Sequence, residues 1–245
     1  MKARVPVYMV MVLAGLMIVS ACKKEKAPTA IDETINPVTP GYTHAGLGEY
    51  SGVPSGTFII LPENISIVGQ IRGGMQKGNG TLVKGKPGGA PYMMFDEKDT
   101  YLPVGTGTYV NLFVTFKNNG ASPAHFTLPA GLIFCDDTTG VGDTTSIPQH
   151  GFLLKNEIID IAGGAEASFQ LKTYCLNSHG TPSNYGIVYN FGPVTNYPGL
   201  VEIVSIMKSK QEPVGHEGEI QGIIWNVTNG NGLTAQDRAT LNALP

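Results

Sequence analysis

The segment that most restricts the fold runs from Thr108 and reads TYVNLFVTFKNNG. Its side chains alternate strictly, with aromatic or polar residues at odd positions and apolar residues at even positions. One face carries Val110, Leu112, Val114 and Phe116, and the other carries Tyr109, Asn111, Phe113, Thr115 and Lys117. This period of two predicts a β-strand with one buried face, and the closing KNNG predicts a turn.

Further short segments with β character follow the same pattern and are separated by Pro-, Gly- or Thr-rich breaks. The chain contains 32 Gly and 17 Pro, which suits a β domain rich in loops. The segment IAGGAE, residues 161–166, is interpreted as a hairpin turn between two successive strands. Short strands at this spacing predict an antiparallel β-sandwich over residues 57–192.

The period changes near the C-terminus. Leu200, Ile203, Val204 and Met207 have the spacing of one helix face. A second helix is expected within residues 216–230, and a third begins at an approximate capping box formed by Thr234 and Asp237. A cluster of about three helices over residues 193–245, packed on the β domain, places the chain in the α+β class.

The first residues have the organisation of an export signal. Lys2 and Arg4 precede an apolar run that ends at Val19, and small residues lead to Cys22. The run is shorter than the ~20 residues that span a membrane. A plain signal or anchor helix with a coincidental cysteine is the alternative. The sequence Val19-Ser20-Ala21-Cys22 resembles the lipobox of bacterial lipoproteins. The resemblance implies that residues 1–21 are removed and that Cys22 carries diacylglycerol and a further acyl chain such as palmitate. The inner membrane, the outer membrane and the cell surface all fit this anchor, and the outer membrane is the location we expect.

Residues 22–56 are charged at first and then rich in Pro, Thr and Gly, without an apolar period. Such a segment is expected to be a flexible tether. Removing Lys2 and Arg4 from the 16 basic residues leaves 14 against 19 acidic residues, a net charge near −5. This acidic balance argues against nucleic acid as a partner.

Cys135 and Cys175 remain once Cys22 is assigned to the lipid anchor. Exported proteins meet an oxidising compartment, and two remaining cysteines at the ends of predicted strands favour a Cys135–Cys175 disulfide. Free, buried thiols are the second possibility.

A third possibility comes from two short motifs. YCL, residues 174–176, and IQGIIW, residues 220–225, resemble the thioester domains of bacterial surface adhesins. In that family a cysteine attacks a glutamine carboxamide, ammonia leaves, and the resulting thioester captures surface amines or hydroxyls. The resemblance implies that Cys175 supplies the sulfur and Gln221 the acyl group, behind an apolar wall.

Other residues suggest no catalytic centre. Asp136, Asp137 and Asp143 lie in a Gly-rich loop but lack the pattern of a calcium loop. The histidines at 125, 150, 179 and 216 lack the spacing of zinc ligands. We therefore expect no metal, no cofactor and no enzyme activity. The expected protein is a lipid-anchored, exported, non-catalytic binding or structural module for an unidentified protein or glycan, and the covalent adhesin is the alternative.

Overall fold

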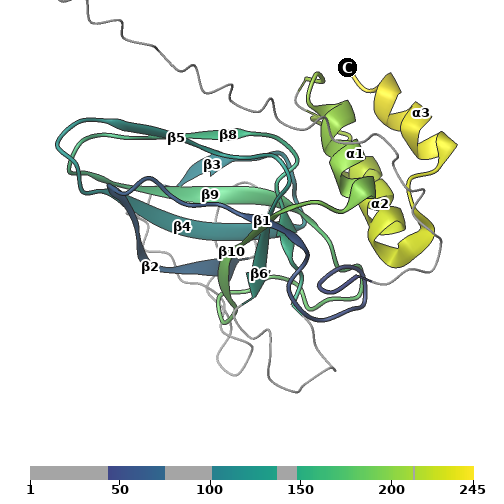
Figure 1. Ribbon diagram of the computed structural model, residues 1–245, viewed down its shortest axis with the longest axis horizontal. Helices are drawn as coiled ribbons and strands as arrows, with labels where there is room; N and C mark the ends of the chain where they lie inside the picture. Colours follow the sequence, from purple (N-terminus) through teal and green to yellow (C-terminus); the bar gives the residue numbers. More distant parts are fainter. Residues whose placement is uncertain (1–43, 75–100, 137–147, 212) are drawn as a thin grey trace, which may run out of the picture. The chain divides into compact units, whose positions relative to one another are not determined.

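The computed structural model describes residues 44–74, 101–136, 148–211 and 213–245 (Figure 1). Every described residue belongs to one compact unit, which lies within residues 37–245. Within the described ranges, no helix combines the length and apolarity that crossing a membrane requires. The predicted signal peptide and Cys22 lie outside the described residues.

Ten strands lie within the described residues, and six of them close into a barrel. The barrel strands pair in the order β10-β2-β4-β9-β7-β6, and β6 pairs with β10 to complete the circle. The predicted sandwich does not form, because this closure joins what would be its two open edges. The strands are β1 (Gly56–Phe58), β2 (Ile65–Gly74), β3 (Leu102–Val104), β4 (Val110–Asn118), β5 (Ala124–Leu128), β6 (Leu132–Asp136), β7 (Gly151–Phe152), β8 (Glu157–Ile161), β9 (Glu166–Cys175) and β10 (Val188–Thr195).

Strand β10 closes the barrel because it pairs with different strands along its two edges. Its first two residues pair with β2, and β6 pairs with it from Tyr189 to Val194. The register of the β6 ladder shifts between Phe191 and Val194. This irregular stretch includes Gly192, where a Cβ atom would lie 2.7 Å from the sulfur of Cys135. Such irregularities bend a strand and help a sheet to curve into a barrel.

Strands β4 and β9 lead into a second, two-stranded sheet made of β5 and β8 (Figure 1). The turn after β4 and the turn before β9 lie together, because the Gly164 N–H donates to the Gly120 carbonyl at 2.8 Å. Residues 161–166 were expected to form a hairpin turn between neighbouring strands. That prediction is wrong in its pairing: β8 pairs with β5 and β9 pairs with β4, so the turn connects two sheets.

Asn118 fixes the corner between these two sheets. Its side chain is fully buried. The Nδ2 group donates to the carbonyls of Ser122 at 2.8 Å and Ile161 at 3.2 Å. Its Oδ1 atom accepts from the Gly120 N–H and from Asn64 Nδ2, both at 2.9 Å. One amide therefore connects two loops and the end of β8.

The strand predicted around β4 is confirmed, but its single buried face is not, because Asn111 and Phe113 on the other face are buried as well. All four even-numbered apolar side chains are buried in the cluster that fills the barrel. Residues from β2, β6, β9 and β10 complete that cluster, and so does one side of the β5/β8 sheet. Burial of these inward-facing side chains supplies much of the stabilising free energy of this part.

Three helices follow β10: α1 (Pro198–Met207), α2 (Glu217–Asn226) and α3 (Ala235–Ala243). A π-helical turn, η1 (Val227–Asn231), extends α2. The predicted apolar face of α1 is confirmed, because Leu200, Ile203 and Met207 are fully buried and Val204 packs beside them. This face and that of α2 form a second cluster with the outward-facing side chains of β6, β7 and β9.

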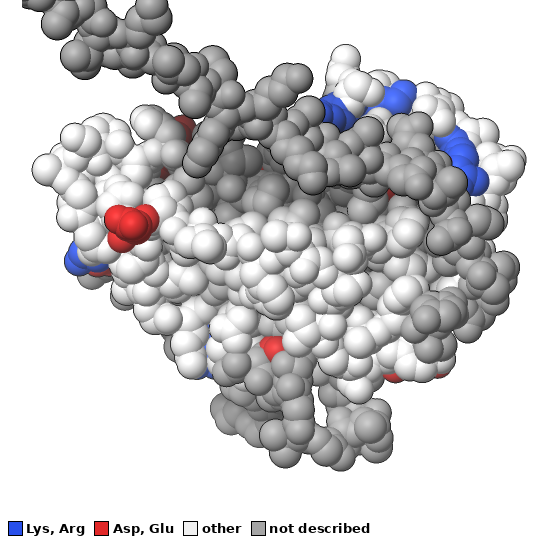
Figure 2. Space-filling model, viewed as in Figure 1, with Lys and Arg blue, Asp and Glu red and all other residues white. Residues whose placement is uncertain are grey.

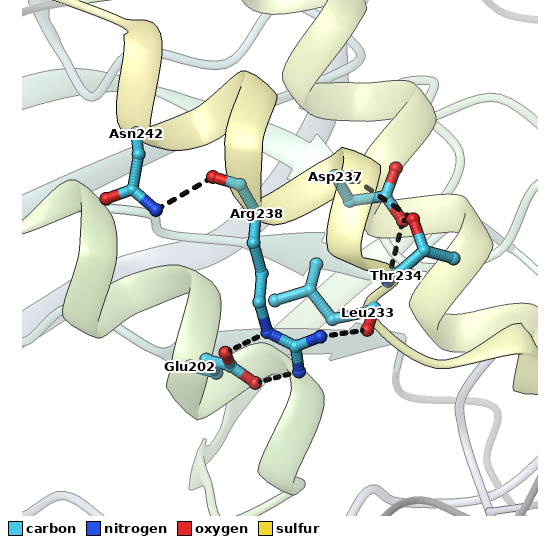
Figure 3. Close-up of polar contacts among 6 residues, drawn as sticks. All are labelled: Glu202, Leu233, Thr234, Asp237, Arg238 and Asn242. Atoms are coloured by element: carbon cyan, nitrogen blue, oxygen red, sulfur yellow. Dashed lines mark hydrogen bonds and ion pairs between the residues drawn. The ribbon is translucent and has the colours of Figure 1, made fainter.

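Polar contacts hold the start of α3 (Figure 3). The predicted capping box is confirmed: the Asp237 N–H donates to Thr234 Oγ1 at 3.1 Å, and the Thr234 N–H donates to Asp237 Oδ2 at 3.0 Å. Arg238 donates through Nε and Nη2 to both carboxylate oxygens of Glu202 on α1. Its third nitrogen donates to the Leu233 carbonyl at 2.7 Å. These partly buried contacts orient α3 against α1.

The segment before β1 belongs partly to the folded unit. Residues 44–56 were expected to be the end of the tether, yet Leu47 is buried in the cluster beneath the helices. The Gly48 N–H donates to the Leu176 carbonyl at 3.0 Å, which holds the segment against the end of β9. The sequence did not predict this packing, because a single leucine among Gly and Tyr residues forms no repeating apolar pattern.

Candidate functional site

Cys175 is the last residue of β9, and its backbone would lack a partner on one edge without α2. Strand β4 begins at Val110, opposite Thr173, and so does not extend to Cys175. Strand β7 lies on the other edge, where Gly151 is the register partner of Cys175. A buried N–H and C=O left without partners here would destabilise the fold.

Gln221 of α2 supplies the missing partner. The Cys175 N–H donates to Gln221 Oε1 at 2.8 Å, and Gln221 Nε2 donates to the Cys175 carbonyl at 2.7 Å. The side-chain amide thus replaces the peptide group of an absent strand. Both residues are fully buried. The two residues singled out by the thioester resemblance, 46 positions apart, are therefore in direct contact.

The sulfur of Cys175 lies in its own small polar environment. Its thiol donates to the Asn177 carbonyl at 3.2 Å, and the Asn177 N–H donates to the sulfur at 3.3 Å. Burial raises the pKa of the Cys175 thiol to about 11, and the backbone of Asn177 and the side chain of Trp225 act in the opposite direction. The buried indole N–H of Trp225 contributes to this lowering, yet it makes no regular hydrogen bond to any acceptor among the described residues.

Cys135 lies on the opposite face of the same barrel wall. Phe134, Gly151 and Cys175 occupy one row across β6, β7 and β9, so their side chains point to the same side. Cys135 follows Phe134 and points the other way, into the cluster beneath the helices. Burial, aided by the charge of Asp136, raises its pKa to about 12.

The predicted Cys135–Cys175 disulfide is absent from the structure, in which both thiols are free. The strand register gives the physical reason. One strand, β7, lies between the two cysteines, and neighbouring strands are ~4.8 Å apart, which exceeds disulfide reach when doubled. Their Cβ atoms also point to opposite faces of the sheet. An even cysteine count carries no information about either property.

A buried polar network joins the end of β9 to the start of the folded unit. No sequence motif predicted it. Asn177 accepts from the His150 N–H at 2.9 Å and donates to the carbonyls of Gly46 at 3.3 Å and Gly48 at 3.0 Å. The His150 ring bonds to the Gly46 carbonyl through Nδ1 and to Asp136 through Nε2, at 3.0 and 3.2 Å. This network fixes the loop that carries the Cys175 sulfur contacts.

The remaining candidates are not brought together. Asp136 is buried beside His150, while Asp137 and Asp143 lie outside the described residues. His125 and His216 each approach one exposed carboxylate on a separate part of the surface. Across the described ranges, no group of three or more potential ligands is arranged to hold a metal ion.

A cavity of about 350 Å³ lies between the barrel and α1, away from Cys175. Its lining combines apolar and basic side chains: Ala130, Leu154, Lys155, Asn156, Val204 and Lys208. Lys155 donates to the Gln211 carbonyl at 2.9 Å, which draws its ammonium group toward the loop that follows α1. The cavity is large enough to hold a small ligand.

No protein-family model matches the chain, and neither a curated protein nor a solved structure is significantly similar to it. Arguments about function therefore depend on the geometry of this site and on the motifs in the sequence.

Proposed function

We propose that Cys175 and Gln221 form an internal thioester through which the protein attaches covalently to amines or hydroxyls on a partner surface. The observation that carries this proposal is the contact between the Gln221 side-chain amide and the Cys175 main chain, at 2.7 and 2.8 Å. The YCL and IQGIIW motifs resemble those of adhesin thioester domains, and the resemblance required these two residues to meet. The absence of the competing disulfide leaves the Cys175 sulfur free to react.

The proposed reaction balances without an external reactant. The Cys175 sulfur attacks the Gln221 carboxamide carbon, the S–C bond forms, and the C–N bond breaks. The thiol proton leaves with the nitrogen as ammonia. A target amine then attacks the same carbon, forms an amide bond and returns the proton to the sulfur.

The contacts at the site suit this reaction. The Cys175 N–H is already 2.8 Å from Gln221 Oε1, so it stabilises the negative charge that develops on that oxygen. The Asn177 N–H and the Trp225 indole favour the thiolate over the thiol. Ile223 and Ile224 lie in the packed helix interface, which keeps water from hydrolysing the thioester.

The surface of the unit also suits a partner that is not a polyanion. On the face shown in Figure 2, most of the described surface is uncharged, and the basic groups are few. A protein or glycan surface that presents amines or hydroxyls matches such a face better than nucleic acid does. Lipidation of Cys22 and the tether after it would hold the unit at the membrane, with the outer membrane as the proposed location.

Methylamine labelling tests the thioester directly. The full-length protein, exported and purified in detergent, is treated with methylamine and digested, and the peptide that contains Gln221 is analysed by mass spectrometry. We expect one methylamine on Gln221 and one newly titratable thiol at Cys175 for each molecule labelled.

Matched variants complete this experiment. Cys175→Ala abolishes the labelling, because no thioester can form. Cys135→Ser leaves it unchanged, because that thiol faces the other side of the barrel wall. Labelling that survives in Cys175→Ala, or wild-type protein that takes up no methylamine, contradicts the proposal.

A non-covalent binding module is the second candidate function, and the cavity beside α1 is the observation that favours it. In this alternative Gln221 is a purely structural amide, and a small ligand contacts Lys208 and Val204 in the cavity. Screening glycan and peptide libraries against wild type and Val204→Trp, which fills the cavity, tests it. A ligand that binds both proteins equally rules out the cavity as the site.

Lipid anchoring has its own test. Cys22→Ala should leave unprocessed precursor and abolish metabolic labelling with palmitate. Normal processing of that variant would contradict the lipobox interpretation.

A further inference from the structure

One stripe of α2 carries both the proposed acyl donor and a tryptophan. Gly218, Gln221 and Trp225 are spaced as i, i+3 and i+7, so they lie along one side of the helix. Gln221 is fully buried, whereas Gly218 is exposed and Trp225 is half-buried. The stripe therefore runs from the surface, over the carboxamide, to the indole.

Tyr109 lies along this stripe from the barrel side. Its ring packs edge-on against Trp225, with the ring centres 5.3 Å apart and the planes at 78°. Its hydroxyl group points toward the first turn of α2, since a Cβ atom on Gly218 would lie 3.8 Å from it. Tyr109 thus spans the stretch of helix under which Gln221 is buried, and 39% of its own surface remains exposed.

The loop that carries Tyr109 is anchored beside Cys175. The Gly107 N–H donates to the Lys172 carbonyl at 3.1 Å, and the Tyr174 hydroxyl donates to the Thr106 carbonyl at 3.4 Å. A Cβ atom on Gly107 would lie 2.1 Å from the Thr173 backbone, so the loop is in close contact with β9. Tyr109 is consequently held over the last residues of that strand.

Trp225 forms the inner layer. It packs against the barrel cluster that contains Cys175. Its indole N–H is buried and has no regular acceptor among the described residues, although it lies next to the sulfur. A buried donor without an acceptor is destabilising, and an oxygen of an incoming reactant would provide one.

We propose that Tyr109 and Trp225 form an aromatic cover that controls access of nucleophiles to the bond between Cys175 and Gln221. The proposal deepens the thioester function, because it assigns to that site a selectivity for slim, unbranched primary amines. Such an amine reaches the carboxamide carbon when the two rings separate. A bulky or branched amine is excluded while Tyr109 is in place.

The experiment compares Tyr109→Ala with Tyr185→Ala in the full-length protein. Tyr185 has the same exposed fraction, 39%, but packs on Arg72 at a different place. Rates of labelling at Gln221 are measured with methylamine and with the bulkier tert-butylamine. Loss of one aromatic pair shifts the equilibrium between the closed and the open cover by up to about tenfold. We therefore expect the Tyr109→Ala protein to react about tenfold faster with the bulky amine. Tyr109→Phe keeps the ring and should behave as wild type.

A second readout separates the cover from the thioester. In the same proteins, methylamine first opens any thioester and frees the Cys175 thiol, and the rates at which a small maleimide then modifies Cys175 and Cys135 are compared. If wild type takes up no methylamine, the thioester fails, and the cover is judged by thiol modification alone. Faster modification of Cys175 with Cys135 unchanged supports the cover. Equal rates in Tyr109→Ala and Tyr185→Ala, or a parallel rise at both cysteines, overturn it.

Discussion

Cys135 and Cys175 are the same residue, buried to nearly the same extent in the same barrel wall, yet their surroundings differ completely. Cys135 faces the apolar cluster beneath the helices, and its sulfur lies against Gly192. Cys175 faces the barrel interior, and its backbone is paired with the Gln221 carboxamide. Burial alone therefore does not define a functional cysteine. What distinguishes Cys175 is a set of hydrogen-bonding groups arranged around both its sulfur and its backbone.

The largest effect on stability is expected from removing the Gln221 carboxamide, which pairs with the Cys175 backbone. Gln221→Leu keeps a similar volume but leaves the buried N–H and C=O of Cys175 without partners. In a Cys175→Ala background, where no thioester can form, we expect the free energy of unfolding to fall by about 2–5 kcal/mol.

Denaturant titration measures this difference. Gln211→Leu is the matched control: its side chain is exposed, and its change should stay within about 0.5 kcal/mol. A Gln221→Leu protein as stable as its parent would show that the amide pairing contributes nothing, and the contrast between the two cysteines would lose its basis.

The second largest effect on stability is expected from replacing Asn177. Its side chain is buried and bonds to three backbone groups in the loops next to Cys175. Asn177→Ala should reduce the free energy of unfolding by about 2–4 kcal/mol. Once methylamine has freed the Cys175 thiol, Asn177→Ala should also make Cys175, but not Cys135, accessible to thiol reagents in the folded protein.

The neighbouring variant Ser178→Ala removes one exposed side-chain contact to Asn229 and should be nearly neutral. If thermal or denaturant unfolding showed that Asn177→Ala and Ser178→Ala lose the same free energy of unfolding, the role given to the buried network would be contradicted.

Alkaline pH distinguishes the two cysteines in another way. Burial raises the pKa values from 9.0 to about 12 for Cys135 and to about 11 for Cys175 when each is a free thiol. The unfolded chain therefore releases these protons first, so stability is lost as pH rises from about 9 through these values.

A thioester removes Cys175 from this titration. Methylamine treatment frees the thiol, and the treated protein should lose about 2 kcal/mol more than untreated protein between pH 9 and pH 11. Cys135→Ser should flatten the decline in both. Superimposable stability profiles for treated and untreated protein would argue against a thioester.

The smallest effect on stability is expected at α3, where the polar contacts are only partly buried. Arg238 binds Glu202 through two nitrogens, but 44% of its side chain is accessible to solvent. Arg238→Ala should change the free energy of unfolding by less than about 1 kcal/mol, well below Gln221→Leu. Thr234→Ala, which removes the helix cap, should cost about 1 kcal/mol. If Arg238→Ala lowered the free energy of unfolding as much as Gln221→Leu, burial would not explain the difference in stability between these sites.

Local patterns in the sequence predicted local structure well. The strand at β4, the apolar face of α1 and the capping box of α3 depend on side chains within one element, and all three are confirmed. The single buried face expected of β4 is not, because neighbouring elements also bury Asn111 and Phe113. The sandwich prediction failed because strand periodicity is the same in a sandwich and in a barrel. Closure depends on the register of β10 with β6, which couples residues more than 50 positions apart.

The candidate site was predictable in part for the same reason. Two short motifs singled out Cys175 and Gln221, and the structure brings them together. The disulfide was favoured by counting cysteines, but counting does not reveal that Cys135 faces the other side of the wall. The contributions of Asn177, His150 and Tyr109 come from loops that meet only in the folded chain, and no short motif marks them.

The intact mass of the exported, unreduced protein tests the thioester most directly. The proposal predicts a mass lower than that of the processed, lipidated sequence by one ammonia, a deficit that persists after reduction and disappears in Cys175→Ala. A deficit of two hydrogens that reduction reverses would instead establish a disulfide. A mass without any deficit, with both thiols modified after unfolding, would contradict the thioester and leave Gln221 as a structural partner of the β9 backbone.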